Sequence, residues 1–279
     1  MSHTFIRTFN NRNRPILAGD KPVERTHFNL VRLTPGETYR YRLSEFESVV
    51  VPLTGTCDLT VNGESFLNLG HRTTVWDGKA DAVYAGPNAD VAIVAQSDCE
   101  IAIAGGWWDR QMAPFRIRPE EVEMVDVGSH ETKSRRRIFH ILGQNGAGRA
   151  GNLLVSELYA DEGCWSGYPP HKHDTDRPPE ETRHNEIYNF RFRPENGFGL
   201  QLLQRDGMAV GQAFHVLNAS TLKIGAGYHP CVAAPGHEMY YFTIIAGQSQ
   251  RSLRQFFQPT YAYQIETIPG IKDMIAKFR

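Results

Sequence analysis

Hydrophobic residues along this chain come in short runs, which turn residues separate at nearly even intervals. The run Leu59–Val61 leads directly into Asn62-Gly63, and a strand expected over Thr73–Trp76 leads into Asp77-Gly78. Asn-Gly or Asp-Gly between two hydrophobic runs is typical of a tight β-hairpin turn. Even turn spacing with little helical periodicity favours a β-sandwich or β-barrel over an α/β fold.

The second half of the chain repeats this style. Strands are expected over Leu153–Tyr159, Glu186–Arg193 and Glu238–Ala246. The tail over Ile268–Arg279 is the exception, because its hydrophobic residues have helical spacing after Pro269, which predicts a short helix. The chain is therefore expected to be all-β with a helical end.

The rhythm breaks between residues 107 and 150, where a short helical turn is expected to open at Pro119. We therefore predict an N-terminal β-unit over residues 1–106, a connecting segment over 107–150, and a C-terminal β-unit over 151–279. The two units are expected to share one architecture.

Composition and charge narrow the function. The 279 residues include 30 Lys+Arg and 31 Asp+Glu, a net charge of −1, which gives no electrostatic reason to expect nucleic acid or an anionic membrane as partner. No apolar run is long enough to cross a bilayer, and Met1–Pro15 lacks the apolar stretch of a secretory signal. The four cysteines form no CxxC pair. A cytoplasmic protein with reduced thiols is expected.

The most informative stretch is Tyr168-Pro169-Pro170-His171-Lys172-His173-Asp174. In an extended chain, residues i and i+2 point to the same face, so His171 and His173 can direct two imidazoles at one metal ion. Lys172 alternates with them and is expected to point away.

A carboxylate ligand is expected at Glu186. Period-two alternation places Glu186 on the face shared by Tyr188, Phe190 and Phe192, which is an apolar, inward face. A carboxylate there is costly unless it is paired or bound to a metal. Glu180 and Glu181 are rivals for this role, but they lie in a loop-like segment.

A third imidazole is expected from His229, which the glycines of Gly225-Ala226-Gly227 allow to turn inward. Three histidines and one carboxylate suit one divalent Zn, Mn, Fe or Ni ion with open positions for a substrate. His184, His215 and His237 are expected to be structural or rim residues, with a contact behind the ligands as the competing role for His184.

One glycine-rich motif points elsewhere. The segment Gly146–Gly151 matches GxGxxG, but a dinucleotide site needs a helix to begin at these glycines. The residues that follow lead into Asp161-Glu162-Gly163 too soon for a crossover helix. A glycine-rich turn between two strands is the better interpretation.

Several blocks of the sequence resemble the 5-deoxy-glucuronate isomerase family of inositol catabolism, which has a bicupin fold. The most specific are Tyr168–Asp174 and Gly227-Tyr228-His229-Pro230. Matching blocks run from about residue 105 to 241 and also include Gly105–Trp108, Pro179–Thr182, Glu186–Tyr188, Pro194–Gly199, Ala233–Gly236 and Tyr240-Tyr241. The segment Thr182–Asn189 departs from the more acidic and aromatic run usual in the family, so a related uronate stays open as the substrate.

The resemblance implies two stacked β-barrels of jelly-roll type, with a metal only in the second. The first half carries Tyr39, Arg40 and Arg42 near the position of the histidine pair, and Asn88 at the position of His229. The implied cofactor is one divalent ion, Zn or Mn before Fe or Ni. The partner is a small sugar acid, with association into homo-oligomers left open.

The implied reaction is the conversion of 5-deoxy-D-glucuronate to 5-dehydro-2-deoxy-D-gluconate, an aldose–ketose isomerisation. The expected bases are Glu180, Glu181 and Asp174, in no fixed order. Arg183 is expected to hold the substrate carboxylate and Tyr241 to supply a hydroxyl, while Arg191 is the weaker cation because it faces away from Glu186. The alternatives are a cupin dioxygenase and a non-catalytic sugar-acid binding protein.

Overall fold

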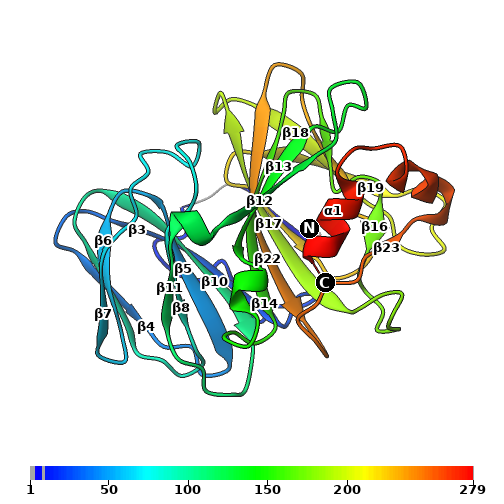
Figure 1. The fold of residues 1–279 in the computed structure, drawn as a ribbon. Helices are drawn as coiled ribbons and strands as arrows, with labels where there is room; N and C mark the ends of the chain where they lie inside the picture. Colours follow the sequence, from blue (N-terminus) through cyan, green and yellow to red (C-terminus); the bar gives the residue numbers. More distant parts are fainter. Residues whose placement is uncertain (1–3, 8–9, 279) are drawn as a thin grey trace.

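The computed structural model describes residues 4–7 and 10–278, and these form an almost entirely β protein in two halves (Figure 1). The N-terminal half pairs a six-stranded sheet, in the order β11-β8-β5-β10-β3-β2, with a four-stranded sheet, in the order β4-β9-β6-β7. Its strands are β2 (Leu17–Ala18), β3 (Thr26–Leu33), β4 (Thr38–Tyr41), β5 (Phe46–Thr54), β6 (Cys57–Val61), β7 (Glu64–Leu69), β8 (Ala82–Ala85), β9 (Val91–Ala95), β10 (Cys99–Trp107) and β11 (Phe115–Ile117).

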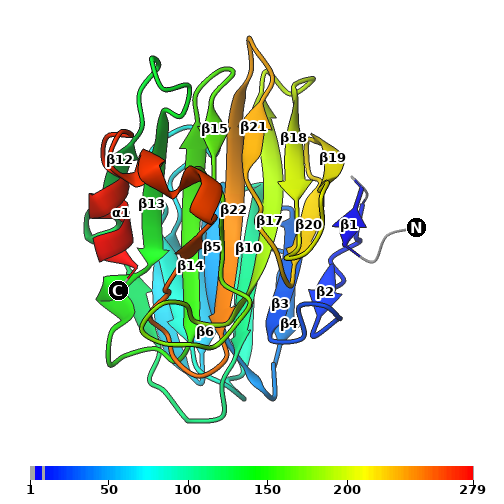
Figure 2. The same ribbon diagram turned by 90° about the vertical axis from the view of Figure 1, so that its right-hand side faces the viewer.

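The C-terminal half has a seven-stranded sheet in the order β1-β20-β17-β22-β14-β13-β12, a four-stranded sheet in the order β15-β21-β18-β19, and the pair β16-β23. The strands run side by side in Figure 2. They are β1 (Phe5–Ile6), β12 (Glu123–Val127), β13 (Arg136–Leu142), β14 (Leu153–Ala160), β15 (Trp165–Ser166), β16 (His171–Lys172), β17 (His184–Arg193), β18 (Phe198–Leu203), β19 (Gln212–Leu217), β20 (Thr221–Ile224), β21 (Cys231–Ala233), β22 (Glu238–Gly247) and β23 (Phe256–Phe257).

This distribution of strands bears on the expected boundaries at 106 and 150. The segment 107–150, expected as a connector, supplies β11 to the N-terminal half and β12 and β13 to the C-terminal half. Conversely β1, near the start of the chain, pairs with β20, with Phe5 opposite Leu222. The N-terminal β1 therefore belongs to the sheet of the C-terminal half, and the segment 107–150 contributes strands to both halves.

Three hydrophobic cores follow from strand alternation. One lies inside each half, between its larger and its smaller sheet. The third lies between the halves, where the outer faces of the two larger sheets pack together. Phe28 of β3 and Phe242 of β22 stack there, with ring centroids 6.2 Å apart. The larger sheets are thus buried on both faces, which explains their continuous hydrophobic runs.

Buried polar bonds also join the halves. Arg72 Nη1 lies 3.0 Å from the Glu157 carboxylate, which also accepts a 2.9 Å hydrogen bond from Tyr240 Oη, and the Arg72 and Glu157 side chains are 1% and 0% exposed. The Glu47 carboxylate accepts hydrogen bonds from the backbone N–H groups of Gly151 and Leu153, at the start of β14. An ion pair this deeply buried is costly to break.

Most predicted local structure is confirmed. Asn62-Gly63 joins β6 to β7, and both residues have positive φ, as a type I′ turn requires. A 3₁₀ turn, η1 (Pro119–Glu121), opens at Pro119. The GxGxxG segment follows the 3₁₀ turn η2 (Gln144–Gly146) and joins the antiparallel strands β13 and β14, so it is a turn between strands.

One predicted strand is wrong. Residues 73–76 form a turn, because the Asp77 carboxylate accepts hydrogen bonds from the backbone N–H groups of Thr73 and Thr74. Such local side-chain bonds compete with strand pairing.

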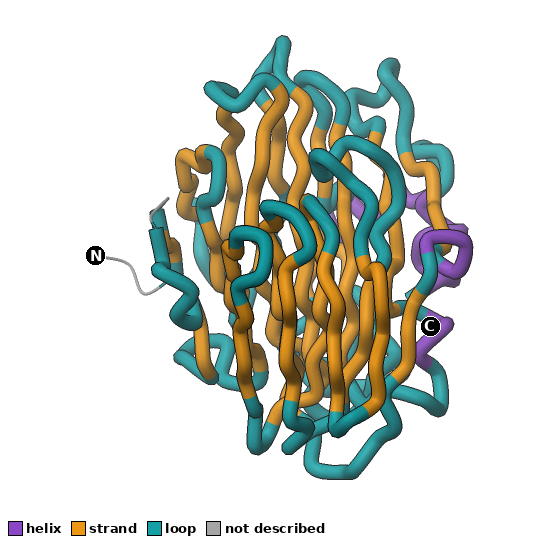
Figure 3. The backbone as a smooth tube through the Cα atoms, turned by 90° about the vertical axis from the view of Figure 1, so that its left-hand side faces the viewer, coloured by secondary structure: helices purple, strands orange, loops and turns teal. Residues whose placement is uncertain are grey.

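The helix predicted to open at Pro269 is present, but it begins at Ile271 and ends at Lys277, and Arg279 lies outside the described residues. The last part of the chain carries the 3₁₀ helix η3 (Pro259–Ile265) and this helix, α1 (Ile271–Lys277), which buries Ile271 and Met274. Figure 3 shows the helical turns gathered on one side of the strands. Gly270 has a φ of +74°, and a Cβ there would lie 2.3 Å from the Asp126 carbonyl oxygen, so glycine is needed where α1 meets the chain near β12. Among the described helices, none is long and apolar enough to cross a membrane.

Candidate metal centre

Three of the four predicted ligands meet inside the C-terminal half. His173 Nε2 lies 2.9 Å and His229 Nε2 lies 3.1 Å from Glu186 Oε2, and the three ligand atoms fall within 4.8 Å of one another. Glu186 projects inward from β17, as its alternation with Tyr188 predicts. All three residues are buried.

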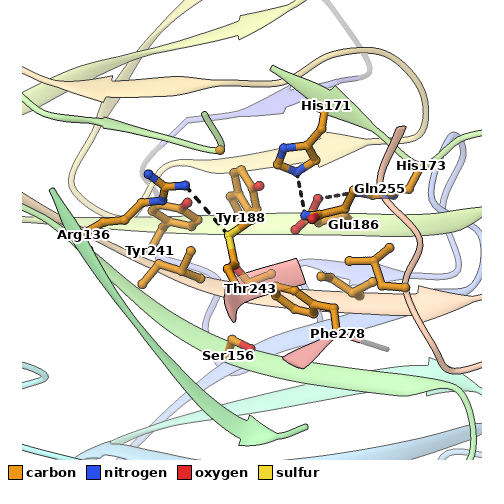
Figure 4. A pocket seen from close by; sticks show the side chains of 15 residues that line it. Arg136, Ser156, His171, His173, Glu186, Tyr188, Tyr241, Thr243, Gln255 and Phe278 are labelled. Carbon is orange, nitrogen blue, oxygen red and sulfur yellow. Dashed lines mark hydrogen bonds and ion pairs between the residues drawn. The ribbon is translucent and has the colours of Figure 1, made fainter. Parts of the chain in front are cut away.

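The fourth predicted ligand, His171, lies beside this group (Figure 4). Its ring centroid is 5.0 Å from that of His229 and 6.3 Å from that of His173. Its Nε2 lies 3.0 Å from Gln255 Nε2, so the Gln255 amide donates to it. His171 is therefore adjacent to the three-residue group and bonded to the chain segment that follows β22.

The backbone fixes which nitrogen of each imidazole faces the group. Nδ1 of His171, His173 and His229 lies 3.2, 3.2 and 2.8 Å from the carbonyl oxygens of Pro169, His184 and Gly227, respectively. A carbonyl only accepts, so in a neutral ring Nδ1 carries the proton and Nε2 presents a lone pair. This arrangement behind the ligands is usual in metal sites. His184 makes its contact with His173 through the main-chain carbonyl, and its ring nitrogens lie 3.3 Å from the carbonyl oxygens of Thr182 and Arg251.

The electrostatics of the group favour a neutral His171 and an ionised Glu186, as metal ligands require, but favour a protonated His173. Burial, followed by His229 and His173, lowers the pKa of His171 well below its ordinary value. Burial alone would raise the pKa of Glu186, but bonds to His173 and His229 hold it well below the usual range. Burial alone would lower the pKa of His173, but the Glu186 carboxylate raises it above the ordinary value.

The donor set fits a divalent cation. His229 Nε2 is buried and has no hydrogen-bond partner, although it lies 3.1 Å from a carboxylate oxygen. Lone pairs of imidazole and carboxylate at this separation repel each other unless a proton or a cation lies between them. Imidazole nitrogens with one carboxylate oxygen are ligands that Zn²⁺ and Mn²⁺ accept. The group could therefore hold a metal ion.

A charged cluster holds the two ligand loops together. Lys172 points away from the centre, as predicted, and its Nζ bonds Asp174 at 2.6 Å and Glu181 at 3.1 Å. The Asp174 carboxylate also accepts a 2.8 Å hydrogen bond from the backbone N–H of Gly227, two residues before His229. Burial alone would raise the pKa of Asp174, but hydrogen bonds from Lys172, Thr175 and Gly227 lower it.

The three carboxylates predicted as bases do not line the cavity that extends from the ligands to Arg136, although Asp174 lines a small space beside His173 and His229. Glu181 is fully buried, with its oxygens bonded to Lys172 and Arg177. Asp174 joins the loops as described, and Glu180 is exposed. None of the three is among the residues that line the cavity.

Of the two predicted substrate-binding residues, one lines the cavity and the other does not. Tyr241 lines the cavity, and its hydroxyl lies 2.6 Å from Ser166 Oγ. Arg183 is exposed and does not line the cavity. Arg191 faces the other half, where its guanidinium bonds Glu100 at 2.7 Å. Arg191 therefore points away from Glu186, as the alternation along β17 predicted.

Arg136 and Gln255 are among the cavity residues that sequence reasoning missed. Arg136 stands in the basic run Lys133–Arg137, which reads as a solvated cluster, yet alternation along β13 turns Arg136 inward while its neighbours are partly exposed. That alternation was the available signal. Gln255 lies in an irregular segment, so no periodicity marks it.

The cavity is small and enclosed by several elements. It extends from the ligands past Tyr188 and Tyr241 to Arg136 (Figure 4). Its free volume is about 30 Å³, room for about two water molecules. Leu253, Gln255, Met274 and Phe278, from the last part of the chain, line the remaining side.

Comparison with known proteins agrees with this architecture. The sequence profile of the KduI/IolB family matches residues 8–264. This chain belongs to the KduI/IolB family. It is 32% identical to a protein named 5-deoxy-glucuronate isomerase from Bacillus licheniformis, over 80% of this chain and 82% of that protein. A protein of the same name from Bacillus subtilis strain 168 is 31% identical, over 86% and 87%.

Solved structures extend the comparison to three dimensions. An IolB-like protein from Salmonella typhimurium LT2 superposes with a TM-score of 0.87 at 26% identity, over 94% of this chain and 99% of that chain. An oxalate decarboxylase from Lactobacillus farciminis superposes with a TM-score of 0.58 at 8% identity, over 91% and 87%. The second likeness concerns the fold alone, and it supports the predicted bicupin class.

Proposed function

We propose that this family member is a metal-dependent aldose–ketose isomerase that converts 5-deoxy-D-glucuronate to 5-dehydro-2-deoxy-D-gluconate. The names of the relatives supply the substrate. The observation that carries the proposal is the convergence of His173, Glu186 and His229 in a buried cavity.

In this proposal His171, His173, Glu186 and His229 would hold one Zn or Mn ion, and His171 would need its Nε2, which the Gln255 amide contacts here, to be free for that role. The bound ion would polarise the substrate carbonyl and the neighbouring hydroxyl, as a Lewis acid does. The carbonyl oxygens behind the three imidazoles keep each Nε2 directed at the ion.

Hydroxyl groups of the cavity would orient the sugar. Burial, followed by the Glu186 carboxylate, raises the pKa of Tyr188 well above its ordinary value, and burial does the same for Tyr241. Both side chains therefore keep their protons at neutral pH and can donate hydrogen bonds to sugar oxygens. Isomerisation moves one proton from C2 to C1 and one from O2 to O1, so it needs no oxidant. Because Glu180, Glu181 and Asp174 do not line the cavity, this proposal assigns none of them to that transfer.

The deciding experiment follows 5-deoxy-D-glucuronate with the metal-loaded protein by NMR in D₂O. We expect the keto product without oxygen uptake, and no turnover after the metal is removed. Oxygen consumption with iron restored would favour the dioxygenase alternative. Tight binding of the sugar acid without either reaction would favour a binding protein. Either result would refute the isomerase proposal.

A further inference from the structure

The cavity contains a buried cation that the metal centre does not use. Arg136, on β13, is 1% exposed and lines the cavity together with the ligands. Its guanidinium donates to the carbonyl oxygens of Ser134 at 2.9 Å and Tyr168 at 2.7 Å. Its third contact is the Met274 thioether, with Nη2 3.8 Å from Sδ. Within residues 4–7 and 10–278, no carboxylate forms an ion pair with it.

Among the described residues, two other cations buried as deeply as Arg136 are compensated by carboxylates, whereas Lys223, at 7% exposure, donates to the Lys21 carbonyl oxygen. Arg72 is paired with Glu157, and Lys172 with Asp174 and Glu181. Arg251 also lacks a carboxylate partner, but it donates to four carbonyl oxygens, those of Leu142, Gly143, Gly151 and Leu153. Arg136 has two carbonyls and a sulfur, which is a weak acceptor. A buried charge with so little compensation is expensive, and an anionic ligand would remove that cost.

We propose that Arg136 binds the carboxylate of the sugar-acid substrate and so selects acids over neutral sugars. This inference rests on the proposed function, because it takes the opposite end of the sugar to lie at the metal centre. Arg136 and the ligands lie at different places along one cavity, with Tyr188 and Tyr241 between them (Figure 4). An extended sugar acid has its carbonyl and its carboxylate at opposite ends, as this arrangement requires.

The local chemistry suits a carboxylate. A guanidinium can form two parallel hydrogen bonds to a carboxylate, and these are stronger than bonds between neutral groups. Burial lowers the pKa of Arg136 to about 10, so the side chain is still cationic at neutral pH. The free volume of about 30 Å³ is too small for a sugar acid, so a lining side chain must move. We expect the Met274 side chain to move, because methionine is flexible and its sulfur faces the guanidinium.

The test compares Arg136→Met with Arg135→Met, the partly exposed neighbour, in metal-loaded protein. Titration calorimetry measures the Kd of an analogue of 5-deoxy-glucuronate that cannot isomerise, because its aldehyde is reduced to CH₂OH, and of the neutral counterpart of this analogue with CH₂OH in place of the carboxylate as well. For Arg136→Met we expect the Kd of the acid to rise about 10-fold to 100-fold, with that of the neutral sugar nearly unchanged. Arg135→Met should change neither. Metal content should stay that of the unaltered protein in both variants.

Arg136→Lys is the second variant, because it keeps the charge but loses the fork geometry. It should weaken binding of the acid less than Arg136→Met and leave the neutral sugar unaffected, and it carries the test if Arg136→Met does not fold. Equal losses for acid and neutral sugar would overturn the proposal, as would an unaltered protein that binds both sugars alike. Binding is measured without turnover, so a protein that selects the acid through Arg136 but does not isomerise 5-deoxy-glucuronate refutes only the proposed function.

Discussion

The two halves of the molecule have the same construction and different interiors. Each pairs a larger and a four-stranded sheet around its own core. Inside the N-terminal half that core is formed by aliphatic residues and buried cysteines such as Val50, Ile103 and Cys57. The C-terminal interior holds Glu186, Arg136 and the imidazoles. The fold therefore does not require these polar groups, and their burial costs free energy that a function must justify.

Single positions make the difference concrete. The inward face of β5 carries Ser48 and Val50, and Ser48 is satisfied by a 3.0 Å bond to the Tyr41 hydroxyl. The inward face of β17, in the same central position of its sheet, carries Glu186 and Tyr188. A hydroxyl is satisfied by one neighbour, whereas a carboxylate among imidazoles calls for a cation.

The largest expected effect comes from removing a ligand. His229→Ala should reduce bound metal several-fold or more and lower kcat/KM by more than about 100-fold, since a bound metal contributes several kcal/mol to catalysis. Asn88→Gly is the matched control, because Asn88 holds the corresponding position of the first half and has a positive φ that glycine adopts. Elemental analysis and product formation check both. Equal metal content in the two variants would show that His229 is not a metal ligand.

The next effect concerns the contact between the halves. Arg72→Met leaves the buried Glu157 carboxylate without its partner and should lower the free energy of unfolding by about 3–5 kcal/mol. Urea denaturation measures it. Arg42→Met is the control, because the Arg42–Asp90 pair is exposed and should contribute under about 1 kcal/mol. Similar losses in the two variants would show that burial of the pair is irrelevant.

Acid titration compares the halves directly. Burial lowers the pKa of His27, in the first half, and of His140, in the second, to about 4. Between pH 6.5 and 4 the unfolded chain binds these protons and the folded one does not, so stability falls as pH falls. Each histidine should contribute a loss of about 2.5 kcal/mol between pH 7 and 4.5.

Two variants measure how much of the pH-dependent loss of stability each histidine contributes. His27→Gln and His140→Gln should each flatten the pH dependence of the free energy of unfolding, while His215→Gln, at an exposed site, should not. If the halves unfold together, both buried histidines act on the same transition. A slope unchanged in either variant would contradict the assigned pKa.

The smallest effect tests the cluster behind the ligands. Asp174→Asn should weaken metal binding by about 10-fold to 100-fold, because the amide cannot balance Lys172 and so holds the Gly227 loop less firmly. Competition with a chelator gives the affinity. Asp176→Asn, at an exposed neighbouring position, is the control. A variant that binds metal as tightly as its control would show that Asp174 does not position His229.

The sequence was sufficient for what depends on alternation and spacing. Those patterns predicted the all-β class and the inward Glu186, whereas the convergence of His171, His173 and His229 with it was predicted mostly from the family resemblance. The strand predicted over Thr73–Trp76 is wrong, because the Asp77 carboxylate bonds the backbone there and forms a turn. Glu181 is held within its own irregular loop by Lys172 and Arg177, where no periodicity applies, whereas the place of Gln255 depends on long-range contacts such as that with His171. No local pattern encodes such contacts.

The Glu47 bonds to the start of β14 connect the half without ligands to a wall of the cavity. They fix the strand that carries Ser156 into the cavity, and Glu157 on the same strand is held by Arg72. The face of the first half toward β14 therefore helps to hold the walls of the cavity, although none of the residues that line that cavity comes from this half.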